Sequence, residues 1–347
     1  MRRSKLRHDM RQLNLDAMYL SSPENVRYFS GFTGDNGHLI LTQEEQILLT
    51  DGRYTEQAAM EAKDVTVVLL SGKLSAAISK YVVSRRVGYE SSALSDDTAR
   101  ALRAACPDTE WVPLSHFGLA ARSVKDADEI AHIRRACAIA DAAFAELLPL
   151  IRPGVTEREL KRELEYRMDR LGSEHTAFST IVACGERSSL PHATPTDHAV
   201  SEHDLITFDF GAVSCGYASD ITRTVMLGTP ELSHVFELVL SVQKQVVERV
   251  CPGISCSELD AFQRSLFAEA GMSEYVVHSL GHGVGLQIHE DPRVSPGSET
   301  VLTPGMVITI EPGLYLPGKG GVRTEDTVLV TEHGFERLTN TPHHIVL

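Results

Sequence analysis

Residues 205–226 read Leu-Ile-Thr-Phe-Asp-Phe-Gly-Ala-Val-Ser-Cys-Gly-Tyr-Ala-Ser-Asp-Ile-Thr-Arg-Thr-Val-Met. Segments 205–213 and 217–226 are rich in β-branched and aromatic residues, and the turn residues between them predict a β-hairpin. The hairpin would place Asp209 and Asp220 on adjacent strands, facing each other in an apolar sheet. Aspartates at turns or caps are the common alternative, but two phenylalanines flank Asp209 within its strand. Because a buried carboxylate is costly unless a cation or strong donors compensate it, a metal site is one interpretation of this stretch.

Three later stretches, residues 280–293, 307–315 and 320–330, favour the metal interpretation. The first carries His282 between glycines, the second is an apolar strand ending in Glu311, and the third has Glu325 inside another apolar strand. Packing alone would favour Val or Ile at the two glutamates. Four carboxylates and one imidazole form an oxygen-rich set that two divalent cations would neutralise, and Mn²⁺, Co²⁺ or Zn²⁺ suits such ligands.

At these positions the chain resembles a known family. Asp209, Asp220, His282, Glu311 and Glu325 are similar, in order and local context, to the five ligands of the dinuclear metallopeptidases with the pita-bread fold. That family contains prolidases, proline-specific aminopeptidases, methionine aminopeptidases and the metal-free creatinases. The resemblance covers essentially the whole chain. Because all five ligands are present, the creatinase branch is disfavoured.

The resemblance also implies a role for each ligand. Asp209 would chelate one metal, Asp220 and Glu325 would bridge two, and the other metal would be held by His282 and Glu311. A water shared between two cations is acidic enough to act as hydroxide near neutral pH and to attack the scissile carbonyl. We expect Glu311 to take and return a proton during the reaction.

Two further histidines are candidates for catalysis. Residues 184–192, Cys-Gly-Glu-Arg-Ser-Ser-Leu-Pro-His, resemble the family motif that carries an extra active-site histidine, here His192. His289, seven residues after the metal histidine, resembles the second. Both would steady the carbonyl oxygen or the tetrahedral intermediate. A lone histidine is more often a surface or packing residue, and it is the flanking motifs that favour function here.

Two arginines are expected to act at the substrate side of the site. Arg293 is either a solvated surface residue or a bidentate clamp on the C-terminal carboxylate of a dipeptide, for which a guanidinium is suited. The short stretch 289–311 resembles compact prolidases more than the longer aminopeptidases. Arg323, two residues before Glu325, is expected to orient ligands or the opposite strand.

The N-terminal third has a different pattern. Strand signals at 17–20, 38–42, 46–50, 65–70 and 87–89 alternate with helix signals, one starting at the N-cap Ser22 with Pro23 after it and the others at 51–62, 74–83 and 96–105, which implies an α/β layer domain. Residues 22–34 and 49–54 resemble the creatinase-type N-terminal domain of the proline-specific branch, which methionine aminopeptidases lack. Asp35 and His38 lie in a loop that could reach a partner's active site across a dimer, although a plain hairpin turn is the commoner explanation.

The predicted fold is therefore an α/β creatinase-like domain, residues 1–120, followed by an α+β pita-bread catalytic domain, residues 121–347. Segment 113–120 serves as the linker, and the second domain has predicted helices at 126–150, 156–171, 231–250 and 257–270. A length of 347 residues is enough for two cores.

Composition excludes several classes of function. The net charge of −14 is unfavourable for binding nucleic acid or an anionic membrane surface. No apolar run of about 18 residues, as a membrane-spanning helix requires, is present. The N-terminus lacks the apolar core of a signal peptide, and the six cysteines include no Cys-x-x-Cys pair, so we expect reduced thiols in a cytoplasmic protein.

The sequence thus predicts a cytoplasmic, homodimeric metallopeptidase that cleaves the bond before proline, in Xaa-Pro dipeptides, with two divalent metal ions. Manganese is the expected metal, and cobalt and zinc are alternatives. An Xaa-Pro aminopeptidase acting on longer peptides is the near alternative. A non-catalytic binding module on the same fold is the remote one, and the complete ligand set disfavours it.

Overall fold

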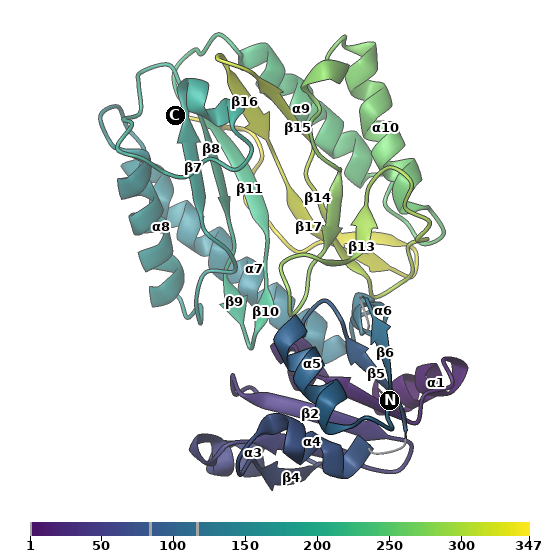
Figure 1. Cartoon of the computed structure of the whole chain (residues 1–347). Coiled ribbons are helices and arrows are strands. Elements are labelled where there is room, and N and C mark those ends of the chain that lie inside the picture. Colours follow the sequence, from purple (N-terminus) through teal and green to yellow (C-terminus); the bar gives the residue numbers. More distant parts are fainter. Residues whose placement is uncertain (1, 83–84, 116–117) are drawn as a thin grey trace. The chain divides into compact units, whose positions relative to one another are not determined.

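The computed structural model describes residues 2–82, 85–115 and 118–347, and the chain divides into two compact units, Met1–Arg122 and Ser123–Leu347. Figure 1 shows the elements of both units. The helices are α1 (Arg2–Gln12), α2 (Pro23–Ser30), α3 (Thr55–Glu61), α4 (Leu74–Val82), α5 (Asp96–Ala105), α6 (Leu119–Ser123), α7 (Ala127–Leu147), α8 (Glu157–Arg170), α9 (Ser233–Val247) and α10 (Cys256–Glu269). No helix within the described residues is long and apolar enough to cross a membrane.

The first unit is built on a mixed six-stranded sheet with the order β4-β3-β2-β1-β5-β6. Its strands are β1 (Ala17–Leu20), β2 (Gly37–Thr42), β3 (Gln46–Thr50), β4 (Thr66–Leu69), β5 (Arg86–Glu90) and β6 (Glu110–Leu114). The pairs β1–β2 and β2–β3 are antiparallel, and the three remaining pairs are parallel. The alternation of strands and helices confirms the predicted α/β class of this part of the chain.

Local sequence signals explain where α2 begins and ends. The hydroxyl of Ser22 accepts a hydrogen bond from the backbone N–H of Asn25, and Pro23 occupies the first helical turn, where its missing N–H costs nothing. Gly31 then ends the helix in the left-handed conformation, with φ of 84°. The N-cap and the first-turn proline confirm the helix start that the sequence predicts.

The segment predicted as a linker, 113–120, is more regular than expected. Pro113 and Leu114 end strand β6, which pairs in parallel with β5, and Leu119 begins helix α6. His116 and Phe117 lie outside the described residues. The prediction missed β6 because Pro113 argues against a strand, yet proline is tolerated on an edge strand, and β6 is an edge.

The second unit contains two larger sheets, with orders β19-β11-β8-β7 and β13-β12-β14-β17-β18, and two small hairpins, β9–β10 and β15–β16. The strands are β7 (Ile181–Cys184), β8 (Leu205–Phe210), β9 (Val213–Ser214), β10 (Tyr217–Ala218), β11 (Ile221–Met226), β12 (Gly281–Gly283), β13 (Glu290–Val294), β14 (Val307–Ile310), β15 (Gly313–Leu316), β16 (Gly320–Arg323), β17 (Asp326–Thr331), β18 (Gly334–Arg337) and β19 (Ile345–Val346). Helices α7 and α8 pack against the first sheet, and α9 and α10 pack against the elements around the second (Figure 1). This arrangement confirms the predicted α+β class.

Core packing determines which way Asp209 points. Phe208 and Phe210 of β8 are fully buried, and each ring centroid lies 5.2 Å from that of Phe144 in α7. Since side chains alternate between the two faces of a strand, Asp209 projects from the face opposite the helix. Two aromatic anchors thus fix the orientation of the carboxylate between them.

The hairpin that carries the two aspartates is less regular than predicted. Strand pairing is interrupted at residues 211–212 and 219–220, where the Ala212 N–H and the Ser219 hydroxyl form a 3.0 Å hydrogen bond. Asp220 lies in this break, before β11, and the strand register pairs Asp209 with Thr222. The two aspartates are therefore not directly opposite each other in the ladder, although both side chains line one pocket. Glu325 likewise lies in a break, between β16 and β17, and not inside a strand.

Candidate metal centre

The five residues predicted to bind metal all line one pocket of about 450 Å³ in the second unit. They come from Asp209 in β8, Asp220 before β11, His282 in β12, Glu311 after β14, and Glu325 before β17. The same pocket is lined by three further histidines and two arginines, His192, His278, His289, Arg293 and Arg323.

The pocket lies where the two larger sheets meet. The backbone N–H of Glu325 donates to the carbonyl of Thr222 over 3.0 Å, and the hydroxyl of Thr327 donates to the carbonyl of Asp220 over 2.7 Å. These bonds join the start of β17 to the start of β11. Carboxylates from both sheets therefore converge at the junction.

His282 presents one nitrogen to the carboxylates. Its Nε2 lies 3.6 Å from an oxygen of Asp220 and 3.4 Å from an oxygen of Glu311. Its Nδ1 lies 3.1 Å from the carbonyl oxygen of Gly283, which can only accept, so Nδ1 carries the proton. The lone pair of Nε2 is left facing the acids, as metal ligation requires. One donor atom each of Asp220, His282 and Glu325 lie within 4.8 Å of one another.

The carboxylates of the pocket repel one another. Burial, and next the charge of Glu325, raises the pKa of Asp220 well above its usual range. Burial, and next the charge of Glu311, does the same to the pKa of Glu325, and burial raises the pKa of Glu311 itself to about 8. Burial also lowers the pKa of His282 to about 3, so the imidazole is neutral and supplies no positive charge.

Arg323 supplies a single positive charge against these acids, and it does not satisfy all of them. Its Nη2 lies 2.6 Å from Oδ2 of Asp209. The other oxygen of Asp209, Oδ1, is buried, and no hydrogen-bond partner for it exists among the described residues. A buried carboxylate oxygen without a donor is costly, and a cation is the group that would satisfy it. The donor set, oxygen-rich with one neutral imidazole, fits divalent metal ions.

Threonines orient the glutamates. The hydroxyl of Thr222 donates to Glu325 over 2.7 Å, and the hydroxyl of Thr309 donates to Glu311 over 3.2 Å. The same Thr309 oxygen accepts from the backbone N–H of His282 over 3.0 Å. Each of the two glutamates is thus held by a threonine hydroxyl that restricts its rotamer.

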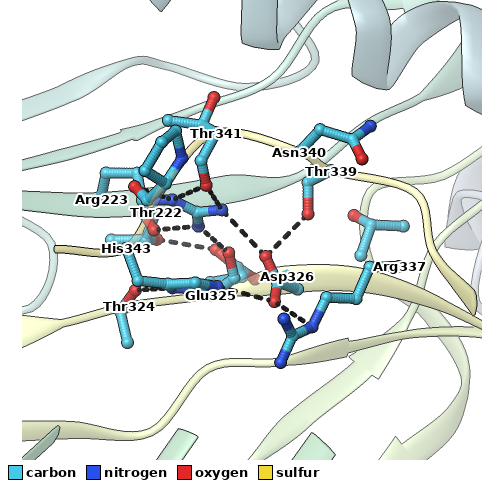
Figure 2. A network of polar contacts seen from close by, with 12 residues as sticks. Thr222, Arg223, Thr324, Glu325, Asp326, Arg337, Thr339, Asn340, Thr341 and His343 are labelled. Atoms are coloured by element: carbon cyan, nitrogen blue, oxygen red, sulfur yellow. Dashed lines mark hydrogen bonds and ion pairs between the residues drawn. The ribbon is translucent and has the colours of Figure 1, made fainter. Parts of the chain in front are cut away.

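Behind Glu325 lies a second polar network (Figure 2). Arg223 donates to the carbonyl oxygens of both Thr222, over 2.9 Å, and Glu325, and it forms an ion pair with Asp326. The side chains of Arg223 and Asp326 are completely buried. The main chain that carries Glu325 is therefore fixed from the side away from the pocket.

The residues predicted to assist catalysis lie on the pocket wall. The ring centroid of His289 is 4.3 Å from that of His282, and burial lowers the pKa of His289, which favours a neutral imidazole. His192 is exposed and lines the same pocket. Of the residues predicted to bind substrate, Arg293 and Arg323 line the pocket, whereas Asp35 and His38 do not.

Arg293 and Arg323 have different surroundings. Arg293 is exposed at the pocket, and no hydrogen-bond or ion-pair partner for its guanidinium exists among residues 2–82, 85–115 and 118–347. Arg323 is buried and donates to Asp209, to Thr222 over 3.2 Å, and to Pro191 O over 3.3 Å. Its donors are thus engaged by the protein, as expected of a residue that orients ligands.

Asp35 and His38 lie in the first unit and do not line the pocket. The carboxylate of Asp35 accepts from the hydroxyl of Tyr54, and Nδ1 of His38 lies 2.9 Å from the hydroxyl of Tyr19.

A hydrogen-bonded relay on the wall of the pocket was not predicted from the sequence. His278 Nδ1 lies 2.7 Å from the carbonyl oxygen of Ser279 and must carry the proton, so Nε2 accepts from the hydroxyl of Tyr315 over 2.9 Å. That hydroxyl oxygen in turn accepts from Arg323. The only sequence signal was spacing, because His278 precedes His282 by four residues and Tyr315 follows Glu311 by four. Both residues otherwise look like ordinary packing positions.

Comparison with known proteins gives matches over nearly the whole chain. The sequence model of metallopeptidase family M24 matches residues 131–332, and that of the creatinase/prolidase N-terminal domain matches residues 2–124. The Xaa-Pro dipeptidase of Pyrococcus furiosus is 39% identical over 347 residues and covers 99% of both chains. The structure of an Xaa-Pro dipeptidase from Bacillus anthracis superposes with a TM-score of 0.97 at 38% identity, covering 100% of this chain and 99% of that one. An X-Pro aminopeptidase structure from Thermotoga maritima gives a TM-score of 0.90 at 36% identity, covering 98% and 100%.

Proposed function

This chain belongs to metallopeptidase family M24, and from that premise we propose that it is an Xaa-Pro dipeptidase, which hydrolyses the peptide bond before a carboxy-terminal proline. Relatives in two Pyrococcus species that share 39% and 40% identity with it are named Xaa-Pro dipeptidases. The preference for dipeptides rests on one observation, the position of Arg293.

Arg293 is paired directly opposite His282 in the antiparallel ladder of β12 and β13. Side chains opposite each other in such a ladder lie on the same face, with their Cβ atoms about 5 Å apart. An unpaired guanidinium therefore stands beside the carboxylate cluster. In an Xaa-Pro dipeptide the C-terminal carboxylate is one residue from the scissile bond, so it falls within reach of this positive group.

Membership of a metallopeptidase family implies divalent metal ions. We propose two ions, held by Asp209, Asp220, His282, Glu311 and Glu325, with manganese as the expected metal and cobalt or zinc as alternatives. When bound, such ions acidify coordinated water and polarise a carbonyl. In the structure, the orphaned oxygen of Asp209 and the mutual repulsion of the acids support this assignment.

Three side chains are proposed to manage protons and charge. Glu311 has a pKa raised to about 8 in the metal-free protein and lies at the pocket, so it is placed to take a proton from the nucleophile and return it to the leaving nitrogen. His192 and His289 line the same pocket and are proposed to donate to the carbonyl oxygen as its charge grows. A lowered pKa keeps His289 neutral, with one N–H available as donor.

An aminopeptidase acting on longer peptides is the competing assignment, because one similar structure is titled an X-Pro aminopeptidase. The test is to offer Mn²⁺-loaded protein Ala-Pro and Ala-Pro-Ala in parallel and to measure kcat/KM for each. A dipeptidase cleaves the dipeptide faster, and the proposal fails if the tripeptide is cleaved equally well.

We further propose a cytoplasmic homodimer in which Asp35, in the loop before β2, and His38, near the start of β2, serve the active site of a partner. The cysteines support a reducing compartment, since all six are free. Sedimentation of the protein, and the activity of a His38→Ala variant, test the dimer and the loop separately.

A further inference from the structure

We infer that Glu157 is a positioning residue for His192, because its buried carboxylate ties together the two ends of the loop that carries the histidine. The loop, residues 184–196, runs from the end of β7 past His192. This inference rests on the role of His192 in the proposed function. It assigns a task to a residue that does not line the pocket.

His192 cannot hold its own position. Its side chain is exposed and makes no hydrogen bond with any residue that the structure describes. The placement of the imidazole at the pocket therefore depends on the backbone of its loop. The residues that fix this backbone therefore affect the rate, because a displacement of about 1 Å in a group that acts in the transition state lowers the rate on the order of a hundredfold.

The carboxylate of Glu157 holds both ends of the loop. Glu157 is the first residue of α8 and its side chain is completely buried. One oxygen accepts from the backbone N–H of Cys184 over 3.1 Å, where the loop begins. The other accepts from the backbone N–H and the hydroxyl of Thr196, both over 2.9 Å, where the loop ends.

Arg187 extends the clamp across the middle of the loop. Its Nε lies 3.0 Å from the carboxylate of Glu157, and its Nη2 donates over 2.8 Å to the carbonyl of Thr194, two residues after His192. On the other side, the hydroxyl of Ser188 accepts from the backbone N–H of Gly321 over 2.8 Å. The loop is thus tied to α8 and to β16, the strand that carries Arg323.

The start of α8 completes this attachment. The backbone N–H groups of Glu157 and Arg158, which lack partners inside the helix, donate to the carbonyls of His198 and Thr196 over 3.0 Å each. A buried carboxylate is tolerated only where hydrogen-bond donors surround it. The donors around Glu157 reach its carboxylate together only when the loop has this conformation. An apolar residue could fill the same space but would not select that arrangement.

The experiment is a double-mutant cycle between Glu157→Gln and His192→Ala, with kcat, KM and metal content measured for each protein on Ala-Pro. An amide can replace only one of the two accepting oxygens, so one end of the loop is released. We expect Glu157→Gln to lower kcat about ten- to a hundredfold in the wild type, with KM and metal content nearly unchanged. In the His192→Ala background the same substitution should lower kcat by less than about twofold.

Glu159→Gln is the matched control. Glu159 lies two residues along the same helix, is exposed, and bonds only to Thr156 in the capping box, over 2.8 Å. It should leave kcat unchanged and lower the melting temperature only slightly, because the glutamine oxygen can keep the capping-box bonds to Thr156. If Glu157→Gln does not fold, Thr196→Val removes a single donor to the carboxylate and should lower kcat several-fold by the same route.

The outcomes separate the inference from the function on which it rests. An equal loss of kcat in both backgrounds, or no loss in either, overturns the role of Glu157. If the wild type does not cleave Ala-Pro, the proposed function fails, but the position of His192 can still be measured. The measurement is the NMR signal of the ¹³C-labelled imidazole of His192, which is assigned by its loss in His192→Ala. That signal should shift or broaden in Glu157→Gln, and an unchanged signal overturns the inference.

Discussion

Arg223 and Asp326 form an ion pair in which a guanidinium nitrogen and a carboxylate oxygen lie 2.9 Å apart with neither side chain exposed (Figure 2). Asp326 also accepts from Gln243 over 2.7 Å and from Thr339 over 2.9 Å. Burial alone would raise the pKa of Asp326, but the charge of Arg223 and a hydrogen bond from His343 hold that pKa below its usual range. The pair is therefore ionised, and it secures the backbone of Glu325 from behind.

Removing one partner of this pair should destabilise the second unit severely. Asp326→Ala leaves the guanidinium of Arg223 buried without its counter-charge, which costs about 3–5 kcal/mol in the free energy of unfolding. Urea denaturation measures the loss. The control is Glu336→Ala, which breaks the half-exposed ion pair with Arg134 and should cost less than about 1 kcal/mol. Equal effects of the two substitutions would contradict the account.

Substitutions at the metal ligands should separate activity from folding. Asp209→Asn and Glu325→Gln each remove a negative charge from the cluster that is proposed to hold two cations, so turnover should be lost while the protein stays folded. Metal content by mass spectrometry and circular dichroism check the two parts of the expectation. A variant with full metal content and wild-type kcat would show that the ligand has been misassigned.

The metal-free protein should become less stable as the pH rises from about 7, where buried histidines such as His282 are neutral in both the folded and the unfolded state, to about 8. The pKa of Glu311 is raised to about 8 by burial, and that of Asp220 is also raised, whereas an unfolded carboxyl titrates near about 4.3. Between these values the folded state binds more protons than the unfolded state, so stability falls with increasing pH. Melting temperatures of chelator-treated protein test this.

Metal should reverse the trend, because cations bind the deprotonated carboxylates and stabilise the folded state more strongly at high pH. The Glu325→Gln variant without metal should show a weaker pH dependence than the wild type, since one repelling charge is gone. A melting temperature of the metal-free wild type that rises between about pH 7 and about pH 8 would contradict the prediction.

The sequence indicated the fold where local signals and burial agree. Ser22 and Pro23 at the start of α2 and the capping box of Thr156 and Glu159 are short-range features whose residue types can be recognised in the sequence, and both form in the structure. The fold class followed from strand and helix alternation together with the resemblance. The breaks before Asp220 and Glu325 were not predictable, because the tertiary bonds that join the two sheets create them.

The carboxylates of the site were predictable from the sequence, whereas the buried charges that hold the surrounding backbone were not. Acids in apolar strands are conspicuous, whereas Arg223 and Glu157 look like solvated charges in a sequence. Their partners lie far away along the chain, such as Thr341 for Arg223 and Thr196 for Glu157. Only the folded arrangement shows that both charges are buried.

The choice between dipeptides and longer peptides is tested by Arg293→Ala. The guanidinium is proposed to pair with a dipeptide's carboxylate, and a charge-assisted hydrogen bond of this kind contributes roughly 1.5–3 kcal/mol. The substitution should therefore raise KM for Ala-Pro about tenfold or more. It should also reduce the difference in kcat/KM between Ala-Pro and Ala-Pro-Ala, because the third residue of the tripeptide would collide with the guanidinium in the wild type. Lys319→Ala, which removes an exposed positive charge that does not line the pocket, is the control and should leave both substrates unaffected. If the wild type cleaves both peptides equally and Arg293→Ala changes neither, the dipeptidase assignment falls and the aminopeptidase takes its place.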